Sequence, residues 1–303
     1  MSAATHIQIG GIHFAVRCRE LPVLPEPWVC YRTFLESEPV AASIRVEIDL
    51  QVGGLPDTSR MEKLFDGDSW QLFRSEKGYC LSQAPRGVKL PPAWIACMDS
   101  SFTRGVVYCD DVLVRDNQGV LGLVNPILHR LDQLLLMYIY AAHEGVLVHS
   151  AGMALDGAGY IFPGRSRAGK STISRQFLAR PDVPKLQLLS DDRIAVRREE
   201  GAFQMYGTPW AGDAEVALNL CVPMKAGFFL FHGSENAVRS LTPREAFESL
   251  MPVVSLPWYD RELIIRITSV CERLTATVPF FALDFKPDPS VVDFIRNFTA
   301  ALP

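Results

Sequence analysis

The chain has 303 residues, of which 48% are apolar and 21% are charged, and its formal net charge at neutral pH is −4. This apolar content excludes an intrinsically disordered protein, which could not bury enough apolar surface to offset its ordering entropy. A mildly acidic chain has no overall electrostatic attraction to polyanions, so we expect no nucleic acid partner.

Residues 1–125 are predicted to form a first domain, a mainly antiparallel β region. Alternating runs such as 44–50 (IRVEIDL) and 106–114 (VVYCDDVLV) are typical of half-buried strands. Turn clusters such as Gly53-Gly54 separate these runs. The region carries no recognisable motif.

Residues 126–303 are predicted to form a second domain of the α/β (α+β) class, with a mixed sheet flanked by helices. The pattern changes at Pro126, after which leucines recur at helical spacing. This spacing predicts a helix over 126–144, with Gly145 just past its end.

Two strands and two later helices are predicted in the same domain. The apolar run 146–155 and the short run 160–162 flank a turn at 156–159, which predicts a hairpin. A Thr-x-x-Glu capping box with proline at the first helical position begins one helix at Thr242. The other helix is predicted over 290–300, again directly after a proline.

A phosphate-binding loop is the strongest signal in the sequence, because residues 164–171 match the pattern G-x-x-x-x-G-K-[ST]. Backbone N–H groups of such a loop converge on one anion, and its glycines permit the close approach. Lys170 can then reach the β- and γ-phosphates, and the Ser171 hydroxyl can bind Mg²⁺. A chance match occurs in about one chain in a hundred of this length, but a strand before the loop and an amphipathic helix over 171–179 favour the functional interpretation. The predicted nucleotide-binding residues are Gly164, Arg165, Ser166, Arg167, Ala168, Gly169, Lys170, Ser171 and Thr172.

Two adjacent carboxylates, Asp191 and Asp192, follow a short strand-like run at 186–190. One carboxylate can hold Mg²⁺, and the other can accept a proton from an incoming hydroxyl. A solvated turn is the alternative interpretation of such a pair, and the phosphate loop favours the functional one. His149 lies in the strand before the loop strand, where a lone histidine is more often a core residue, but the predicted hairpin places its strand beside the loop strand.

The order V-H-S-A-G-M-A-L, Y-I-F-P-G-R-S-R-A-G-K-S-T and L-L-S-D-D-R-I-A-V resembles the catalytic domain of HPr kinase/phosphorylase and its relatives. That family has the phosphoenolpyruvate-carboxykinase-like P-loop fold, and the resemblance covers residues 130–303. It implies that Asp192 is the base that deprotonates a serine hydroxyl, that Lys170 holds the phosphates and that His149 lies near the transferred phosphoryl group. Ser171 and Asp191 are the expected metal ligands.

Three departures from the family pattern limit the resemblance. Arg167 stands where glycine is usual, and Arg165 stands where a small or acidic residue is common. An E-R-R-G-type segment, which supplies a metal-binding glutamate in HPr kinase, is missing, and Asp213 or Glu215 could replace that glutamate. The N-terminal region does not resemble that of HPr kinase. We therefore do not expect HPr as the substrate or phosphorylase activity.

The sequence predicts an ATP- and Mg²⁺-dependent kinase that transfers the γ-phosphoryl group to a serine of a protein or peptide. A peptide natural-product precursor is one acceptor of this kind. The alternative is a catalytically inactive nucleotide-binding regulatory protein, which Arg167 and the missing glutamate favour. Neither the acceptor nor the oligomeric state follows from the sequence, and a homo-oligomer is allowed.

The seven cysteines are scattered and form no C-x-x-C pair, which predicts free thiols in a reducing compartment. The first residues lack the basic start and apolar core of a secretory signal. The most apolar helical stretch, 134–142, is far shorter than the about 20 residues that cross a bilayer, so we expect no membrane partner and a cytoplasmic location. Arg193 and the charged residues at 197–200 are predicted to be a solvated hairpin end, and Trp210 is predicted to pack under a loop.

Overall fold

The computed structural model describes residues 4–24, 29–83, 91–128 and 130–302. It divides into two compact units, one comprising Met1–Val29 and Leu35–Ile139 and the other Cys30–Phe34 and Tyr140–Pro303. The division therefore lies within helix α1 (Leu131–Ala142), and the predicted domain boundary between residues 125 and 126 stays a prediction. Within the described ranges, the helices are all too short or too polar to cross a membrane.

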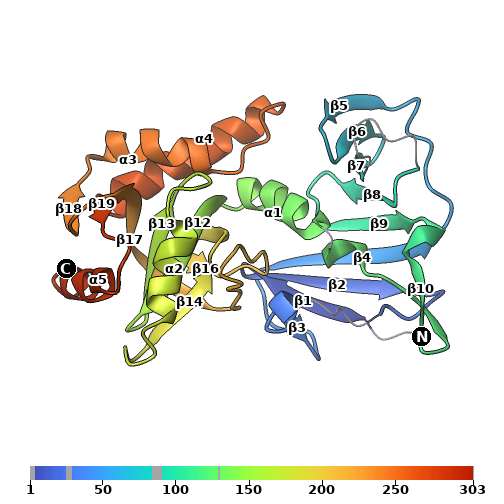
Figure 1. Ribbon diagram of the computed structural model, residues 1–303. Helices are drawn as coiled ribbons and strands as arrows, with labels where there is room; N and C mark the ends of the chain where they lie inside the picture. The colour runs from blue at the N-terminus through green and yellow to red at the C-terminus, as the bar shows by residue number, and fades with distance from the viewer. Residues whose placement is uncertain (1–3, 25–28, 84–90, 129, 303) are drawn as a thin grey trace. The chain divides into compact units, whose positions relative to one another are not determined.

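The first unit contains a nine-stranded sheet in the order β3-β1-β2-β4-β9-β8-β7-β6-β5 (Figure 1). Only the β2–β4 and β4–β9 pairs in this order are parallel, so the sheet is mainly antiparallel, as the alternating runs predict. The strands are β1 (Thr5–Ile9), β2 (Ile12–Cys18), β3 (Leu35–Glu36), β4 (Ile44–Val52), β5 (Glu62–Asp66), β6 (Gln71–Ser75), β7 (Gly78–Ser82), β8 (Trp94–Asp99) and β9 (Arg104–Cys109).

Strand β4 in this sheet has one apolar and one polar face. Successive side chains of a strand point to opposite faces. On β4 the buried residues Ile44, Val46, Ile48 and Leu50 alternate with exposed polar ones. A short hairpin of β10 (Val114–Asn117) and β11 (Val120–Leu123) follows the sheet in the sequence. The chain also forms 3-10 turns at Val29–Tyr31, Asp111–Leu113 and Pro126–Leu128.

The predicted helix over 126–144 begins later than expected. Residues Pro126–Leu128 form a 3-10 turn, in which the Asn125 side chain accepts a hydrogen bond from the Ile127 amide. Arg130 has a φ of 75°, a left-handed conformation that an α-helix does not accommodate. Helix α1 therefore begins at Leu131.

A disulfide joins Cys80 on β7 to Cys97 on β8. The two residues are direct partners in the antiparallel pairing of these strands, which places their side chains on the same face. The prediction that every cysteine is a free thiol is therefore wrong. The argument from cysteine usage for a reducing compartment is lost with it, because disulfides are typical of oxidising compartments.

Removing this disulfide should lower the stability of the first unit. The bonded residues are 17 positions apart, and a crosslink that closes a loop of this size contributes about 3 kcal/mol by restricting the unfolded chain. We expect Cys80→Ala/Cys97→Ala to reduce the free energy of unfolding by that amount in urea, whereas Cys221→Ala, which removes an exposed free thiol, should have little effect. Alkylation of all seven cysteines in the denatured, unreduced wild-type protein would contradict the bond.

The second unit contains an eight-stranded mixed sheet built around two long strands, β12 and β17. The first half of β12 pairs with β15, and its second half pairs with β13 and β14. Strand β17 pairs antiparallel with β16 and parallel with β13 and β19. The strands are β12 (Gly145–Leu155), β13 (Ala158–Pro163), β14 (Leu186–Ser190), β15 (Arg193–Glu199), β16 (Ala202–Tyr206), β17 (Cys221–His232), β18 (Ala237–Ser240) and β19 (Phe280–Phe285).

Helices cover both faces of this second sheet (Figure 1). On one face, α3 (Pro243–Leu250) and α4 (Arg261–Thr277) contribute Leu250 and Leu274 to a core with β12, β15 and β16. On the other face, α2 (Lys170–Leu178) and α5 (Ser290–Ala300) contribute Phe177 and Ile295 to a second core. The chain is therefore a mixed α/β protein, and the predicted capping box at Thr242 is present.

Candidate functional site

The middle of strand β12 organises the candidate site. On one side, the Gly164 amide, which begins the glycine-containing loop, donates to the carbonyl oxygen of His149 at 3.1 Å. On the other side, the Ser150 amide donates to the carbonyl oxygen of Asp192 at 2.9 Å. Backbone hydrogen bonds thus bring two segments that are distant from each other in the sequence to two neighbouring residues of one strand.

The side chains of His149 and Asp192 also meet. His149 Nε2 lies 3.2 Å from Asp192 Oδ1, and these side chains are 23% and 34% exposed. Burial alone would raise the pKa of Asp192, but the hydrogen bond from His149 and the charges of Arg193 and Lys170 outweigh burial, so the pKa lies below its ordinary value. Asp192 is therefore a partly accessible carboxylate that is ionised at neutral pH.

The loop between β13 and α2 is curled. Arg167 and Gly169 both have positive φ values, 69° and 101°, and the Ala168 amide donates to the Arg165 carbonyl oxygen at 3.1 Å. A Cβ atom on Gly164 would lie 2.7 Å from the Ala168 Cβ, so only glycine fits there without a shift of the loop. Helix α2 begins at Lys170, one residue earlier than predicted.

Several amide donors lie close together where the curled loop meets the start of α2. The amides of the first residues of a helix have no acceptor within the helix, and they coincide with the positive end of the helix dipole. In α2 these residues are Lys170, Ser171 and Thr172. The loop and the helix start therefore fit an anion by the chemistry of their donors.

Lys170 is buried and folds back over the loop. Its ammonium donates to the carbonyl oxygens of Gly164 and Arg165 at 3.0 and 3.1 Å. Burial lowers the pKa of Lys170 below its ordinary value, and nearby carboxylates oppose that shift, namely Asp192, Asp191 and Asp213. Lys170 thus lies within electrostatic range of the aspartate pair, whereas Arg165, Ser166 and Arg167 are exposed.

Asp191 holds a loop in place. Its side chain is buried and accepts three backbone hydrogen bonds, from Gly212 at 2.8 Å, from Ala214 at 2.6 Å and from Val216 at 3.2 Å. A Cβ atom on Gly212 would lie 2.8 Å from Asp191 Oδ2, so this contact requires glycine. The geometry makes Asp191 the residue that positions the 212–216 segment, and its metal-ligand role stays a prediction.

Replacing Gly212 by alanine should destabilise this loop. The added methyl group would push against the Asp191 carboxylate, and overpacking of this kind costs about 1–3 kcal/mol. We expect Gly212→Ala to lower the melting temperature measured by circular dichroism, whereas Ala211→Ser, at the exposed neighbouring position, should leave it unchanged. Equal melting temperatures for the two variants would contradict the expected overpacking at position 212.

Arg193 belongs to the site, contrary to the prediction of a solvated hairpin end. Its Nε lies 3.6 Å from Asp192 Oδ2, and its Nη1 donates to Ser255 Oγ at 3.0 Å. Ser255 follows the 3-10 turn η4 (Met251–Val253), and its amide donates to the Leu147 carbonyl oxygen on β12 at 2.8 Å. The sequence offers no signal for this contact, because 62 positions separate Arg193 from Ser255.

The two acidic residues considered as replacements for the missing glutamate lie on the loop that Asp191 holds. The Asp213 carbonyl oxygen accepts a hydrogen bond from Arg175 on α2 at 3.1 Å, and the Glu215 amide donates to the Gly212 carbonyl oxygen at 3.1 Å. Within the described part of the chain, no group of three or more His, Cys, Asp or Glu side chains is arranged to hold a metal ion. Their metal roles stay predictions.

Comparisons with known proteins show only a distant likeness. No family model matches the chain, and no curated protein matches it. Among solved structures, the Hpr(Ser) kinase/phosphatase from Coxiella burnetii is similar at 14% identity and a TM-score of 0.31, over 50% of this chain and 95% of that one.

Proposed function

We propose that this chain is a kinase that transfers the γ-phosphoryl group of ATP to a serine hydroxyl of a protein or peptide. The observation that carries the proposal is the pairing of Asp192 with His149 beside a curled, amide-rich loop that ends in Lys170. Phosphoryl transfer needs little covalent chemistry from a protein, because positioning and electrostatic stabilisation supply most of the catalysis. The site supplies groups that can position the substrates and groups that can stabilise negative charge.

The loop and the start of α2 are assigned to the triphosphate. Amides of residues 166, 167 and 169–172 would bind phosphate oxygens, as the helix start and the positive φ values favour. The ammonium of Lys170, which donates to two loop carbonyl oxygens, would turn to the β- and γ-phosphates. The exposed guanidinium groups of Arg165 and Arg167 are available to further phosphate oxygens.

Magnesium fits this site through one protein hydroxyl. Mg²⁺ in nucleotide sites uses one or two protein ligands together with phosphate oxygens, and Ser171, at the start of α2, has the residue type and position for this role. When bound, Mg²⁺ neutralises charge on the phosphate oxygens. Asp191 is assigned instead to the 212–216 loop, because its carboxylate already accepts three amide hydrogen bonds.

Asp192 is assigned to the acceptor. Its carboxylate would accept a hydrogen bond from the serine hydroxyl and take its proton as the serine oxygen bonds to the γ-phosphorus. The bond between that phosphorus and the β–γ bridging oxygen breaks in the same transfer, and ADP leaves. His149 holds Oδ1, and Arg193 lies on the side of Oδ2, so the carboxylate has one orientation. Ser255 fixes the far end of Arg193, which makes Arg193 and Ser255 positioning residues.

Incubation of the full chain with γ-³²P-labelled ATP, Mg²⁺ and an array of serine-containing peptides tests the proposal. Label on serine, located by mass spectrometry, is the expected result. Alanine in place of the labelled serine should remove the signal. Binding of ATP with neither transfer nor hydrolysis would contradict the proposal and favour a regulatory nucleotide-binding protein.

A further inference from the structure

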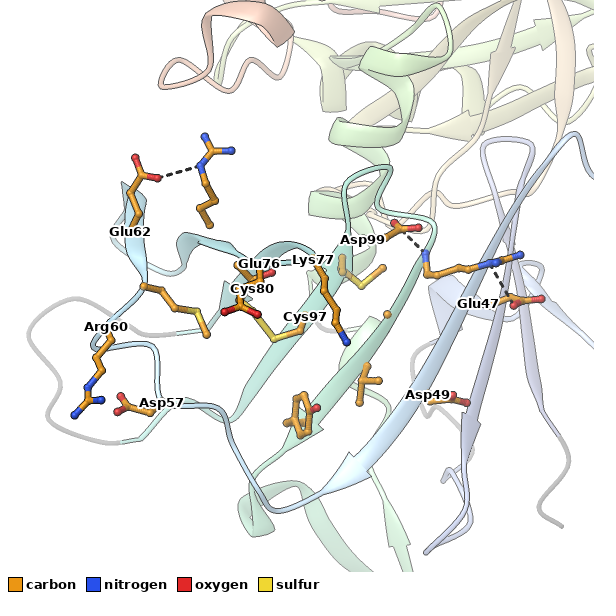
Figure 2. Close-up of a pocket in the computed structure, with 18 of the residues that line it drawn as sticks. Glu47, Asp49, Asp57, Arg60, Glu62, Glu76, Lys77, Cys80, Cys97 and Asp99 are labelled. Carbon is orange, nitrogen blue, oxygen red and sulfur yellow. Dashed lines mark hydrogen bonds and ion pairs between the residues drawn. A yellow bond between two sulfur atoms is a disulfide. The ribbon is translucent and has the colours of Figure 1, made fainter.

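The face of the first unit's sheet that carries the polar side chains of β4 is hollowed into a cleft of about 930 Å³ (Figure 2). The described residues that line it lie between Arg17 and Tyr108 and belong to the first unit. Sites that enclose small ligands have volumes of this order. The proposed phosphoryl-transfer residues all belong to the second unit and do not use it.

The floor of the cleft is apolar. Strand pairing places Val106 on β9 opposite Cys97 on β8, and Cys97 opposite Cys80 on β7. These residues and Tyr108, two positions after Val106, line the cleft, and the Cys80–Cys97 disulfide crosses its floor (Figure 2). A ligand that lies across the strands therefore meets an apolar centre.

Charged side chains of both signs line the cleft around this apolar floor, and two pairs of them stand near its two ends. At one end, Arg17 on β2 pairs in register with Asp49 on β4. At the other end, the turn between β6 and β7 supplies Glu76 and Lys77, and Figure 2 shows the Lys77 side chain extending toward the floor. These four side chains form no hydrogen bond or ion pair with any residue that the structure describes. They are therefore available to a ligand.

This charge pattern selects the class of ligand. A polyanion would be repelled by Asp49 and Glu76, and a polycation by Arg17 and Lys77. A polypeptide segment can combine an apolar centre with acidic and basic side chains at both ends. From β2 to β7 the floor crosses four strand spacings, or about 19 Å at ~4.8 Å each, which equals the length of about six extended residues.

We propose that this cleft binds an extended segment of about six residues in a polypeptide, apolar at its centre and mixed in charge at its ends. The inference rests on the proposed function in one respect: the polypeptide is taken to be the phosphoryl acceptor, docked by a segment separate from its reactive serine. The first unit then confers acceptor recognition, and the second confers transfer.

Fluorescence anisotropy with the full chain, in the absence of nucleotide, tests the cleft directly. The probe is the fluorescein-labelled hexapeptide EKVLEK, and the matched peptides are EEVLEE, KKVLKK and EKSSEK. We expect EKVLEK to bind at least tenfold more tightly than each of the other three. Equal affinities, or tighter binding of a peptide with charges of one sign, would overturn the proposal.

A charge-reversal variant locates the binding. Arg17→Glu/Lys77→Glu changes two exposed side chains of the cleft and should weaken EKVLEK binding at least tenfold. Lys63→Glu/Arg115→Glu makes the same change in net charge at exposed positions that do not line the cleft, and should leave affinity unchanged. Circular dichroism verifies that both variants are folded. Equal affinities for the folded variants would overturn the assignment to this cleft.

A separate measurement, the KM for a peptide acceptor, tests whether the cleft contributes to phosphoryl transfer. With a peptide acceptor found by the serine array, Arg17→Glu/Lys77→Glu should raise the KM for that acceptor at least tenfold, and Lys63→Glu/Arg115→Glu should not. An unchanged KM would overturn the docking role even if EKVLEK binds. If the chain transfers no phosphate, the anisotropy series still decides whether the cleft binds peptides, so the two proposals fail separately.

Discussion

Asp192→Asn should lower kcat for transfer to a serine peptide by about 10²–10⁴-fold, the usual contribution of a positioned general base. Asparagine keeps the shape of the side chain and can still contact His149, but it cannot take the serine proton. This loss corresponds to about 3–5 kcal/mol of activation free energy. Steady-state assays at saturating ATP and acceptor measure it, and isothermal titration calorimetry should give an affinity for ATP close to that of the wild-type protein.

The matched control for this variant is Asp284→Asn. Asp284 lies on β19 in the same unit and is exposed, so its replacement removes one negative charge away from the site. It should leave kcat within about twofold of the wild-type value. Normal turnover of Asp192→Asn would contradict the base assignment. Loss of ATP binding in that variant would mean instead that Asp192 contributes to the nucleotide site.

Replacing Lys170 should remove both affinity for ATP and turnover. The lysine is the charged group assigned to the β- and γ-phosphates, and loss of one such stabilising group costs about 10²–10³-fold in rate. Lys170→Met keeps the buried apolar stem and removes only the ammonium, so we expect the loop to stay closer to its native form than in Lys170→Ala. Transfer of labelled phosphate and calorimetric binding of ATP measure the two effects.

Loop disorder is the competing explanation for this result, because the Lys170 ammonium also donates to two loop carbonyl oxygens. Equal melting temperatures of Lys170→Met and the wild-type protein would exclude it. Lys225→Ala, on β17 of the same unit, controls for loss of a lysine and should retain full activity. ATP affinity and turnover that survive in Lys170→Met would refute the proposed phosphate site.

Local patterns predicted the elements that carry the candidate site. The turn at 156–159 predicted the β12–β13 hairpin, and the glycines at 164 and 169 predicted a curled loop before a helix, which the structure contains. These features depend on residues close together in the chain. Short-range backbone preferences and helix-start chemistry are therefore enough to specify them.

Contacts that depend on how distant segments align in the folded chain could not be predicted from the sequence. The amides bound by Asp191 are 21–25 positions away, and Ser255 is 62 positions from Arg193. The Cys80–Cys97 disulfide likewise depends on how β7 and β8 align. Neither the type of these residues nor their spacing in the sequence specifies how the two strands align. The sequence could therefore propose the aspartate pair as a unit but could not separate a loop-holding carboxylate from a partly exposed one.

The two backbone hydrogen bonds at His149 and Ser150 determine how far this chain can be shortened. A fragment starting at residue 157 would retain the glycine-containing loop and both aspartates. It would lack β12, whose peptide groups hold the loop on one side and Asp192 on the other. A piece that can assemble this centre must therefore include β12 and begin no later than Gly145, although the phosphate-loop pattern and the aspartate pair both lie after that strand.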